Sequence, residues 1–210
     1  MQARYLGIID MQARQGGDAT NRRGIERHAK ATFSGKPGRT ITARMALFNL
    51  TELAARLAPG QRLLGIDPGR KRIGLALSDA ECRLATPHST LARGKLAAAA
   101  AAIGAIARAQ GVGGLVIGLP LQPDGSFGPA AQAARDWALA LTEATALPGA
   151  MQDERLSSVT AADFLAEHTA LSATKRRAVI DRLAAAVILQ AALDRLGDQA
   201  ASSRRSRTFT

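Results

Sequence analysis

The chain has 210 residues, of which 47% are hydrophobic and 21% are charged, the composition of a globular protein with a sizeable core. A single cysteine, Cys82, excludes a disulfide framework and a multi-cysteine zinc site. No apolar run approaches the ~20 residues that a membrane span needs. The formal net charge of +11 indicates a polyanionic partner, which is usually nucleic acid.

The positive charge is concentrated at the two ends of the chain. Residues 1–58 carry ten Lys and Arg against four Asp and Glu, residues 59–198 fifteen against thirteen, and residues 199–210 three against none. Residues 1–44 are rich in Gly, Thr and Arg and are expected to form a poorly ordered basic extension. An alternative interpretation takes Met45 as the natural start. Residues 199–210 are expected to be a solvated basic tail, which leaves one domain over 45–198.

Hydrophobic periodicity and turn residues predict the elements in chain order. A short helix over 48–57, with Thr51 as its N-cap, precedes a β-hairpin of strands 62–67 and 73–78. A third strand over 87–91 leads to a helix over 95–110 that ends at Gly111. The remaining predictions are a strand over 115–119, helices over 129–146, 160–167 and 175–196, and a weak strand over 148–152. This order is typical of an α/β fold, a mixed central sheet flanked by helices.

Four acidic residues stand out by their positions. Asp67 ends the first strand of the hairpin, Asp153 and Glu154 follow the weak strand, and Asp181 lies on an apolar helix face. In a structural interpretation, Asp181 caps its helix or pairs with residues 175–177, and Asp67 begins a turn. In a functional one, the carboxylates converge on Mg²⁺ or Mn²⁺, which prefer oxygen ligands. Two such ions can activate a water molecule to attack a phosphodiester bond.

Four ordered blocks resemble the YqgF/RuvX family of Holliday-junction-resolvase-like proteins and pre-16S rRNA nucleases. The match spans roughly residues 60–196, and the order of the blocks makes it specific. The blocks are GIDPGRKRIGLALSD (65–79), VIGLPLQPDG (116–125), DERLSS (153–158) and KRRAVIDRLAAAVILQAALD (175–194). The resemblance implies a ribonuclease H-like fold and a cytoplasmic bacterial protein. It also implies a metal-dependent nuclease that matures the 5′ end of 16S rRNA.

The resemblance also implies roles for the acidic residues. Asp67 matches the family's first-strand acid, and Asp181 matches the acid that opens the last helix. The DERLSS block matches the second acidic element, in which Glu154 is preferred to Asp153 as the ligand. The expected catalytic set is therefore Asp67, Asp153, Glu154 and Asp181, with Asp67, Glu154 and Asp181 binding Mg²⁺ or Mn²⁺. The expected partner is nucleic acid, RNA rather than DNA, or a ribosomal particle, bound by a monomer or homodimer.

Basic residues close to these acids are candidates for contacts with substrate phosphates. They are Arg70, Lys71 and Arg72 in the hairpin turn, Arg155 after the acidic pair, and Lys175 and Arg176 at the start of the last helix. The structural alternative is a solvated turn, an internal ion pair or the polar start of a helix.

Three other functions stay open at the level of the sequence. The first is a resolvase of Holliday junctions or other branched DNA. The second is a non-catalytic module that binds nucleic acid or ribosomes, with structural carboxylates and salt-sensitive binding. The third is a fragment of an actin-like or sugar-kinase-like ATPase, but those proteins need two such domains and this chain has room for one.

Overall fold

The computed structural model describes residues 47–154 and 173–207, with side chains described over 47–154 and 177–202. The predicted extension over 1–44 and the predicted helix over 160–167 lie outside the described residues. All described residues belong to one compact unit, 43–210. In the described ranges, no helix is long and apolar enough to cross a membrane.

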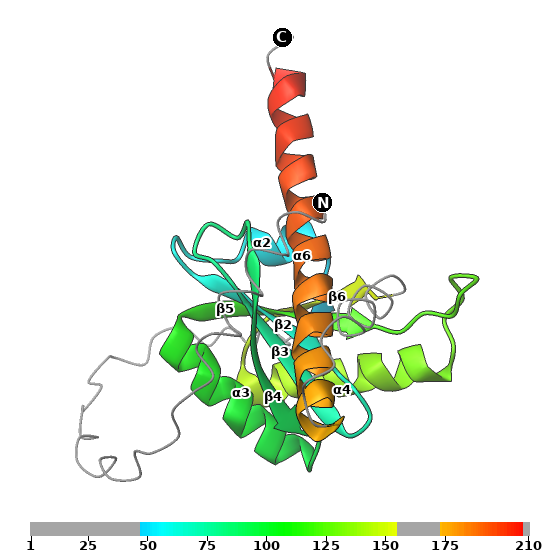
Figure 1. Ribbon diagram of the computed structural model, residues 1–210. Coiled ribbons are helices and arrows are strands. Elements are labelled where there is room, and N and C mark those ends of the chain that lie inside the picture. Colours follow the sequence, from blue (N-terminus) through cyan, green and yellow to red (C-terminus); the bar gives the residue numbers. More distant parts are fainter. Residues whose placement is uncertain (1–46, 155–172, 208–210) are drawn as a thin grey trace, which may run out of the picture. The chain divides into compact units, whose positions relative to one another are not determined.

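A six-stranded sheet in the order β1-β6-β5-β2-β3-β4 forms the centre of this unit (Figure 1). β2 pairs antiparallel with β3, and β3 with β4, whereas β2, β5, β6 and β1 run parallel to one another. The strands are β1 (Leu47–Phe48), β2 (Arg62–Asp67), β3 (Arg72–Ser78), β4 (Ala85–Ala92), β5 (Val112–Leu119) and β6 (Gly149–Asp153). The hairpin and the two later strands are thus confirmed.

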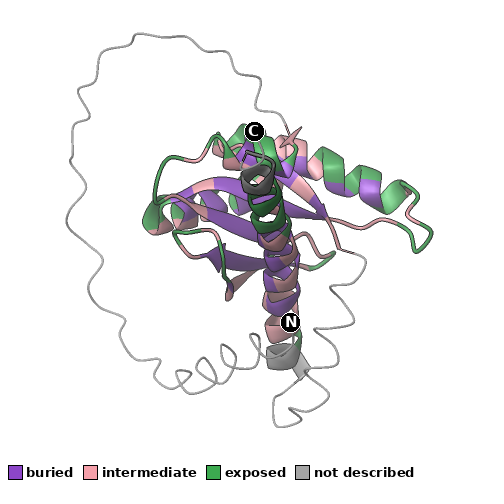
Figure 2. Cartoon of the chain, turned by 90° about the horizontal axis from the view of Figure 1, so that it is seen from above, coloured by how far each residue is buried: buried purple, intermediate pink, exposed green. Residues whose placement is uncertain are grey.

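Helices cover both faces of the sheet. α3 (Leu96–Gln110) and α4 (Pro129–Thr145) pack on one face, and α2 (Leu50–Ala54) and α6 (Ala173–Arg207) on the other. The period-two alternation of the strands divides the core accordingly: Leu64 and Ile66 contact the cluster of α3 and α4, whereas Leu63 contacts that of α6. Figure 2 shows the buried stretch of α6 along the sheet. The predicted mixed α/β architecture is confirmed.

Three of the differences from the predicted elements concern α2, β1 and α6. The N-cap of α2 is Asn49, not Thr51. The Asn49 side chain accepts a hydrogen bond from the Glu52 amide, and the Glu52 carboxylate accepts one from the Asn49 amide, which forms a capping box. The two-residue strand β1 overlaps the predicted helix at Phe48, which is extended because β1 pairs with the distant β6. α6 continues to Arg207, so most of the predicted tail is helical, and its last turns extend past the sheet (Figure 1).

Candidate active site

The carboxyl ends of three adjacent parallel strands, β6, β5 and β2, meet at one edge of the sheet. Asp67 is the last residue of β2, Asp153 is the last of β6, and Glu154 follows it. Leu119 at the end of β5 pairs with Asp153, and its carbonyl accepts from the Glu154 amide at 3.3 Å. The fold therefore brings Asp67 and the acidic pair, which are 86 or more residues apart in sequence, to the same edge.

Gly118 in β5 makes room for the Glu154 carboxylate. A Cβ on this glycine would lie 2.4 Å from Oε2 of Glu154 and 3.0 Å from Ile188 of α6. The Glu154 side chain thus lies over β5, on the face of the sheet that α6 covers. Along β6 the buried Ala150 contacts the α6 cluster and Met151 contacts the opposite one, so the alternation places Asp153 on the opposite face from Glu154.

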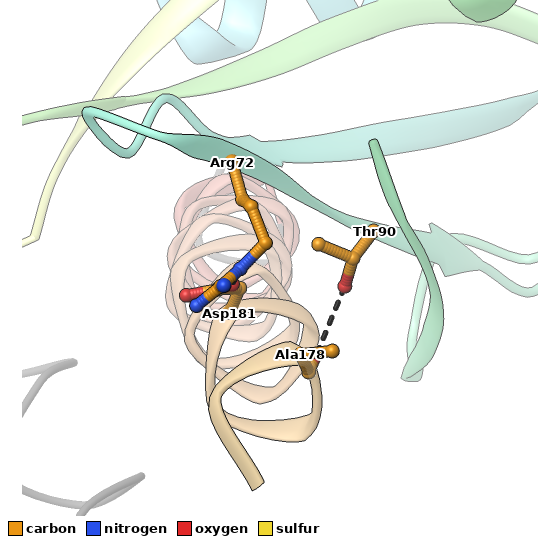
Figure 3. Close-up of polar contacts among 4 residues, drawn as sticks. All are labelled: Arg72, Thr90, Ala178 and Asp181. Atoms are coloured by element: carbon orange, nitrogen blue, oxygen red, sulfur yellow. Dashed lines mark hydrogen bonds and ion pairs between the residues drawn. The ribbon is translucent and has the colours of Figure 1, made fainter. Parts of the chain in front are cut away.

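Gly74 makes the corresponding room for Asp181. It is the direct partner of Asp67 in the β2–β3 ladder, and a Cβ on it would lie 1.9 Å from the carbonyl oxygen of Asp181. α6 therefore crosses β3 in backbone contact at the residue beside Asp67. The Thr90 hydroxyl of β4 donates to the Ala178 carbonyl at 2.9 Å and holds the same turn of α6 (Figure 3).

Two of these carboxyls have raised pKa values, caused first by burial and then by neighbouring carboxylates. Burial and, as a smaller cause, the nearby Asp181 carboxylate together raise the pKa of Asp67 to about 6. Burial, followed by the Asp67 and then the Asp153 carboxylate, raises the pKa of Glu154 to about 7. Glu154 is thus coupled to Asp67, and Asp67 to Asp181, which links the three acids that the sequence singles out.

Asp181 has an ion-pair partner from a distant part of the chain. Nε of Arg72, the first residue of β3, donates to Oδ2 of Asp181 across the gap between sheet and helix (Figure 3). The two side chains are 30% and 22% exposed. The structural interpretation considered residues 175–177 as partners of Asp181 and did not include Arg72, because helix-local spacing carries no information about the facing strand.

Asp67, Glu154 and Asp181 supply only carboxylate oxygens, the ligands that Mg²⁺ and Mn²⁺ prefer. This donor set fits a divalent cation. Within 47–154 and 177–202, however, no three His, Cys, Asp or Glu side chains form a ready metal cage. The Arg72–Asp181 pair supplies a physical reason, since one of the three carboxylates is directed to a guanidinium.

The turn that follows Asp67 is fixed by a residue that the sequence analysis missed. Nη1 of Arg93 donates to the carbonyls of Pro68 at 2.5 Å and Gly69 at 3.0 Å, and its guanidinium lies 5.0 Å from the centre of the Trp137 ring. Arg93 thereby connects the β2–β3 turn to α4. No sequence motif marks Arg93. Gly74 and Gly118 belong to the blocks that resemble the family, but only the structure shows that they face Asp181 and Glu154.

The structure describes some of the basic residues that were predicted to contact substrate phosphates. Arg70 and Lys71 are exposed in the β2–β3 turn beside Asp67, whereas Arg72 is half-buried in its pair with Asp181. Lys175 and Arg176 lie in the first turns of α6, but their side chains are not among those described. Arg155 lies outside the described residues. Asp124 is a turn residue, because its carboxylate accepts from the Ser126 amide at 2.8 Å.

Comparison with known proteins gives a consistent result. A family model described as "RuvX: Holliday junction resolvase" matches residues 61–195. Relatives named "Putative pre-16S rRNA nuclease" include one from Gluconacetobacter diazotrophicus, 54% identical over 150 residues, which are 71% of this chain and 97% of that protein. Another, from Acidiphilium cryptum, is 56% identical over 154 residues, 73% of this chain and 97% of that protein.

Solved structures show a weaker similarity. Thermus thermophilus RuvC in complex with a Holliday junction substrate gives a TM-score of 0.41 at 15% identity, over 65% of this chain and 96% of that one.

Proposed function

Because the chain belongs to the RuvX family of Holliday junction resolvases, we propose that it is a metal-dependent nuclease that hydrolyses phosphodiester bonds in the 5′ precursor segment of 16S rRNA. Membership of this family carries the ribonuclease H-like fold that the four sequence blocks led us to expect. The names of relatives that match over 97% of their own length support the rRNA substrate. Such a role belongs in the bacterial cytoplasm.

One observation supports the proposal most: the strand ends of β2 and β6 and the beginning of α6 bring Asp67, Glu154 and Asp181 to one sheet edge, with two of the three pKa values raised. Asp67 and Glu154 each lie close to another carboxylate of the site, which contributes to their raised pKa values. Neighbouring negative charges favour binding of a cation or a proton.

In the proposed mechanism, these three carboxylates would hold Mg²⁺ or Mn²⁺. The bound ions would supply an activated water and offset charge on the leaving oxygen. The exposed Arg70 and Lys71 bind backbone phosphates beside Asp67 and so align the strand with the carboxylates. Arg93 and Gly118 act through position: Arg93 fixes the turn after Asp67, and Gly118 leaves the space that Glu154 occupies.

The test is cleavage of a 5′-labelled RNA that contains the precursor segment and the mature 5′ end of 16S rRNA. The full chain is incubated with Mn²⁺, Mg²⁺ or EDTA, beside Asp67→Asn and, as a matched control, Asp136→Asn at an exposed position of α4. Metal-dependent cleavage that Asp67→Asn abolishes and Asp136→Asn retains supports the proposal. Salt-sensitive binding without cleavage by any of the proteins would replace it with a non-catalytic binding module.

A second substrate follows from the description of the family model, which names Holliday junctions. A four-way DNA junction tested in parallel under the same conditions distinguishes the two. Faster cleavage of the junction than of the RNA would make branched DNA the substrate, with the same three carboxylates.

A further inference from the structure

Resting on the proposed function, we propose that Arg72 is an exchangeable partner of the site: it pairs with Asp181 when no cation is bound, and contacts a substrate phosphate once a cation takes that carboxylate. The cation and the nucleic acid would then bind cooperatively, because binding of the first frees a contact for the second. The Arg72–Asp181 pair is partly exposed, and an ion pair in contact with solvent can exchange its partners at modest cost.

The first step of the argument is that α6 does not need Arg72 to stay in place. The backbone of Asp181 packs directly on Gly74, and the Thr90 hydroxyl holds the Ala178 carbonyl at 2.9 Å (Figure 3). Both contacts are independent of the Arg72 side chain. The ion pair therefore sets the direction and charge of the Asp181 carboxylate, while sheet packing sets the position of its backbone.

The second step is that Arg72 and a cation compete for one carboxylate. The backbone of Asp181 packs on Gly74, the ladder partner of Asp67, so Asp181 lies beside Asp67 while its carboxylate is paired with Arg72. With Asp181 directed to Arg72, the described side chains form no ready metal cage. Released from Arg72, the Asp181 carboxylate can contribute oxygens beside Asp67.

The third step concerns where the guanidinium goes. Arg72 follows Arg70 and Lys71 directly, and these two exposed cations lie in the turn beside Asp67. A freed Arg72 adds a planar, bidentate donor to this basic turn, and its geometry matches the two oxygens of a phosphate. The destination of the guanidinium thus follows from chain connectivity and charge.

The first measurement is calorimetric titration of the full chain with Mn²⁺ at low salt, for the wild type, Arg72→Gln and Arg70→Gln. Both variants remove one positive charge from neighbouring positions, but only Arg72 pairs with Asp181. We expect Arg72→Gln to bind Mn²⁺ about three- to tenfold more tightly than Arg70→Gln. Circular dichroism verifies that both variants are folded, and Arg72→Lys, which lacks the planar fork, should fall between the wild type and Arg72→Gln.

The second measurement is fluorescence anisotropy with a labelled RNA of the precursor segment, in EDTA or in Ca²⁺, an oxygen-binding divalent cation. In EDTA, Arg72→Gln should bind the RNA as the wild type does, because Arg72 is engaged by Asp181. In Ca²⁺ it should bind several-fold more weakly, with a salt slope lower by about one. Arg70→Gln should be weaker under both conditions.

The outcomes separate the two proposals. No Mn²⁺ binding by the wild type would overturn the proposed metal site and this exchange with it. Mn²⁺ binding that Arg72→Gln leaves unchanged or weakens would overturn the exchange alone, since Arg72 would then only position Asp181. An equal loss of RNA affinity with and without Ca²⁺ would likewise overturn it, because Arg72 would then be a permanent phosphate contact.

Discussion

Asp67 and Gly74 are direct partners across the β2–β3 ladder, and α6 reaches the side of Asp67 only because Gly74 has no side chain. Gly118 in β5 has the same effect toward Glu154. Asp67 thus lies between two strands, β3 and β5, each of which has a glycine on the face covered by α6. These two gaps allow carboxylates from β6 and α6 to approach the carboxylate of β2.

Gly74→Ala is expected to destabilise the fold. Its Cβ would meet three backbone atoms of α6 at 1.9–3.1 Å, and a helix backbone cannot move aside as a flexible side chain can. We expect the free energy of unfolding to fall by about 3 kcal/mol, measured by urea denaturation. Gly94→Ala is the matched control, because a Cβ there meets nothing within 4 Å. Equal stability of the two variants would show that α6 does not pack on β3 at this point.

Gly118→Ala should separate activity from stability. Here the nearest obstacle is the mobile end of a side chain, Oε2 of Glu154 at 2.4 Å, so the fold can adjust for about 1 kcal/mol. The adjustment moves the carboxylate away from Asp67, and we expect cleavage of the labelled RNA to fall at least tenfold, in line with the steep dependence of catalysis on geometry. Normal cleavage by this variant would exclude Glu154 from the site and favour Asp153 as the acidic ligand.

Stability in metal-free buffer should decrease as pH rises from 5 to 8. Asp67 and Glu154 have pKa values of about 6 and 7 in the folded protein, against ordinary values of 3.8 and 4.5. At pH values between the ordinary and the raised pKa of each group, the folded state binds more protons than the unfolded state. The free energy of unfolding therefore falls as the pH rises. Each carboxyl contributes about 2 kcal/mol to this fall.

Denaturation in EDTA at several pH values measures this dependence. Asp67→Asn should flatten it, whereas Asp136→Asn, at an exposed position of α4, should not. Added Mn²⁺ should raise the melting temperature more at pH 8 than at pH 5, because the site is then ionised. A wild-type profile that rises over this range would contradict the assigned direction of both shifts.

Local patterns predicted most of the fold because they correspond to local physical causes. The alternation in residues 73–78 and the run at 115–119 match the observed strands, and Gly111 ends α3 in a left-handed conformation. The N-cap Asn49 also has a local signal, the N-x-x-E spacing to Glu52 that is typical of a capping box. β1 had none, because two residues become a strand only through pairing with β6.

The candidate site was predictable only as a set of acids. Family blocks identified Asp67, the acidic pair and Asp181, but the choice between Asp153 and Glu154 depends on which face of β6 each occupies. The Arg72–Asp181 pair joins residues 109 positions apart, and no spacing rule connects them. These relationships arise from sheet register and helix packing, which a single sequence does not encode in a readable local form.

The helical course of α6 beyond residue 196 can be tested with Gly197→Ala. A Cβ at this position meets nothing within 4 Å, and the backbone is helical. Glycine inside a helix is less favourable than alanine by about 0.5–1 kcal/mol, so the variant should gain ellipticity at 222 nm and resist fraying of the last turns. Unchanged ellipticity would favour the irregular tail that the charge pattern predicted.

Arg93→Ala should lower the turnover rate more than substrate binding. Its guanidinium holds the Pro68 and Gly69 carbonyls, so its loss frees the turn that follows Asp67 and costs about 1–2 kcal/mol of stability. Because Arg93 acts on the position of a carboxylate, we expect kcat for RNA cleavage to fall about tenfold while KM changes little. Arg135→Ala, at an exposed position of α4, controls for the loss of one positive charge. If Arg93 instead contacted phosphates, KM would rise with salt-dependent weakening of RNA binding and kcat would be retained.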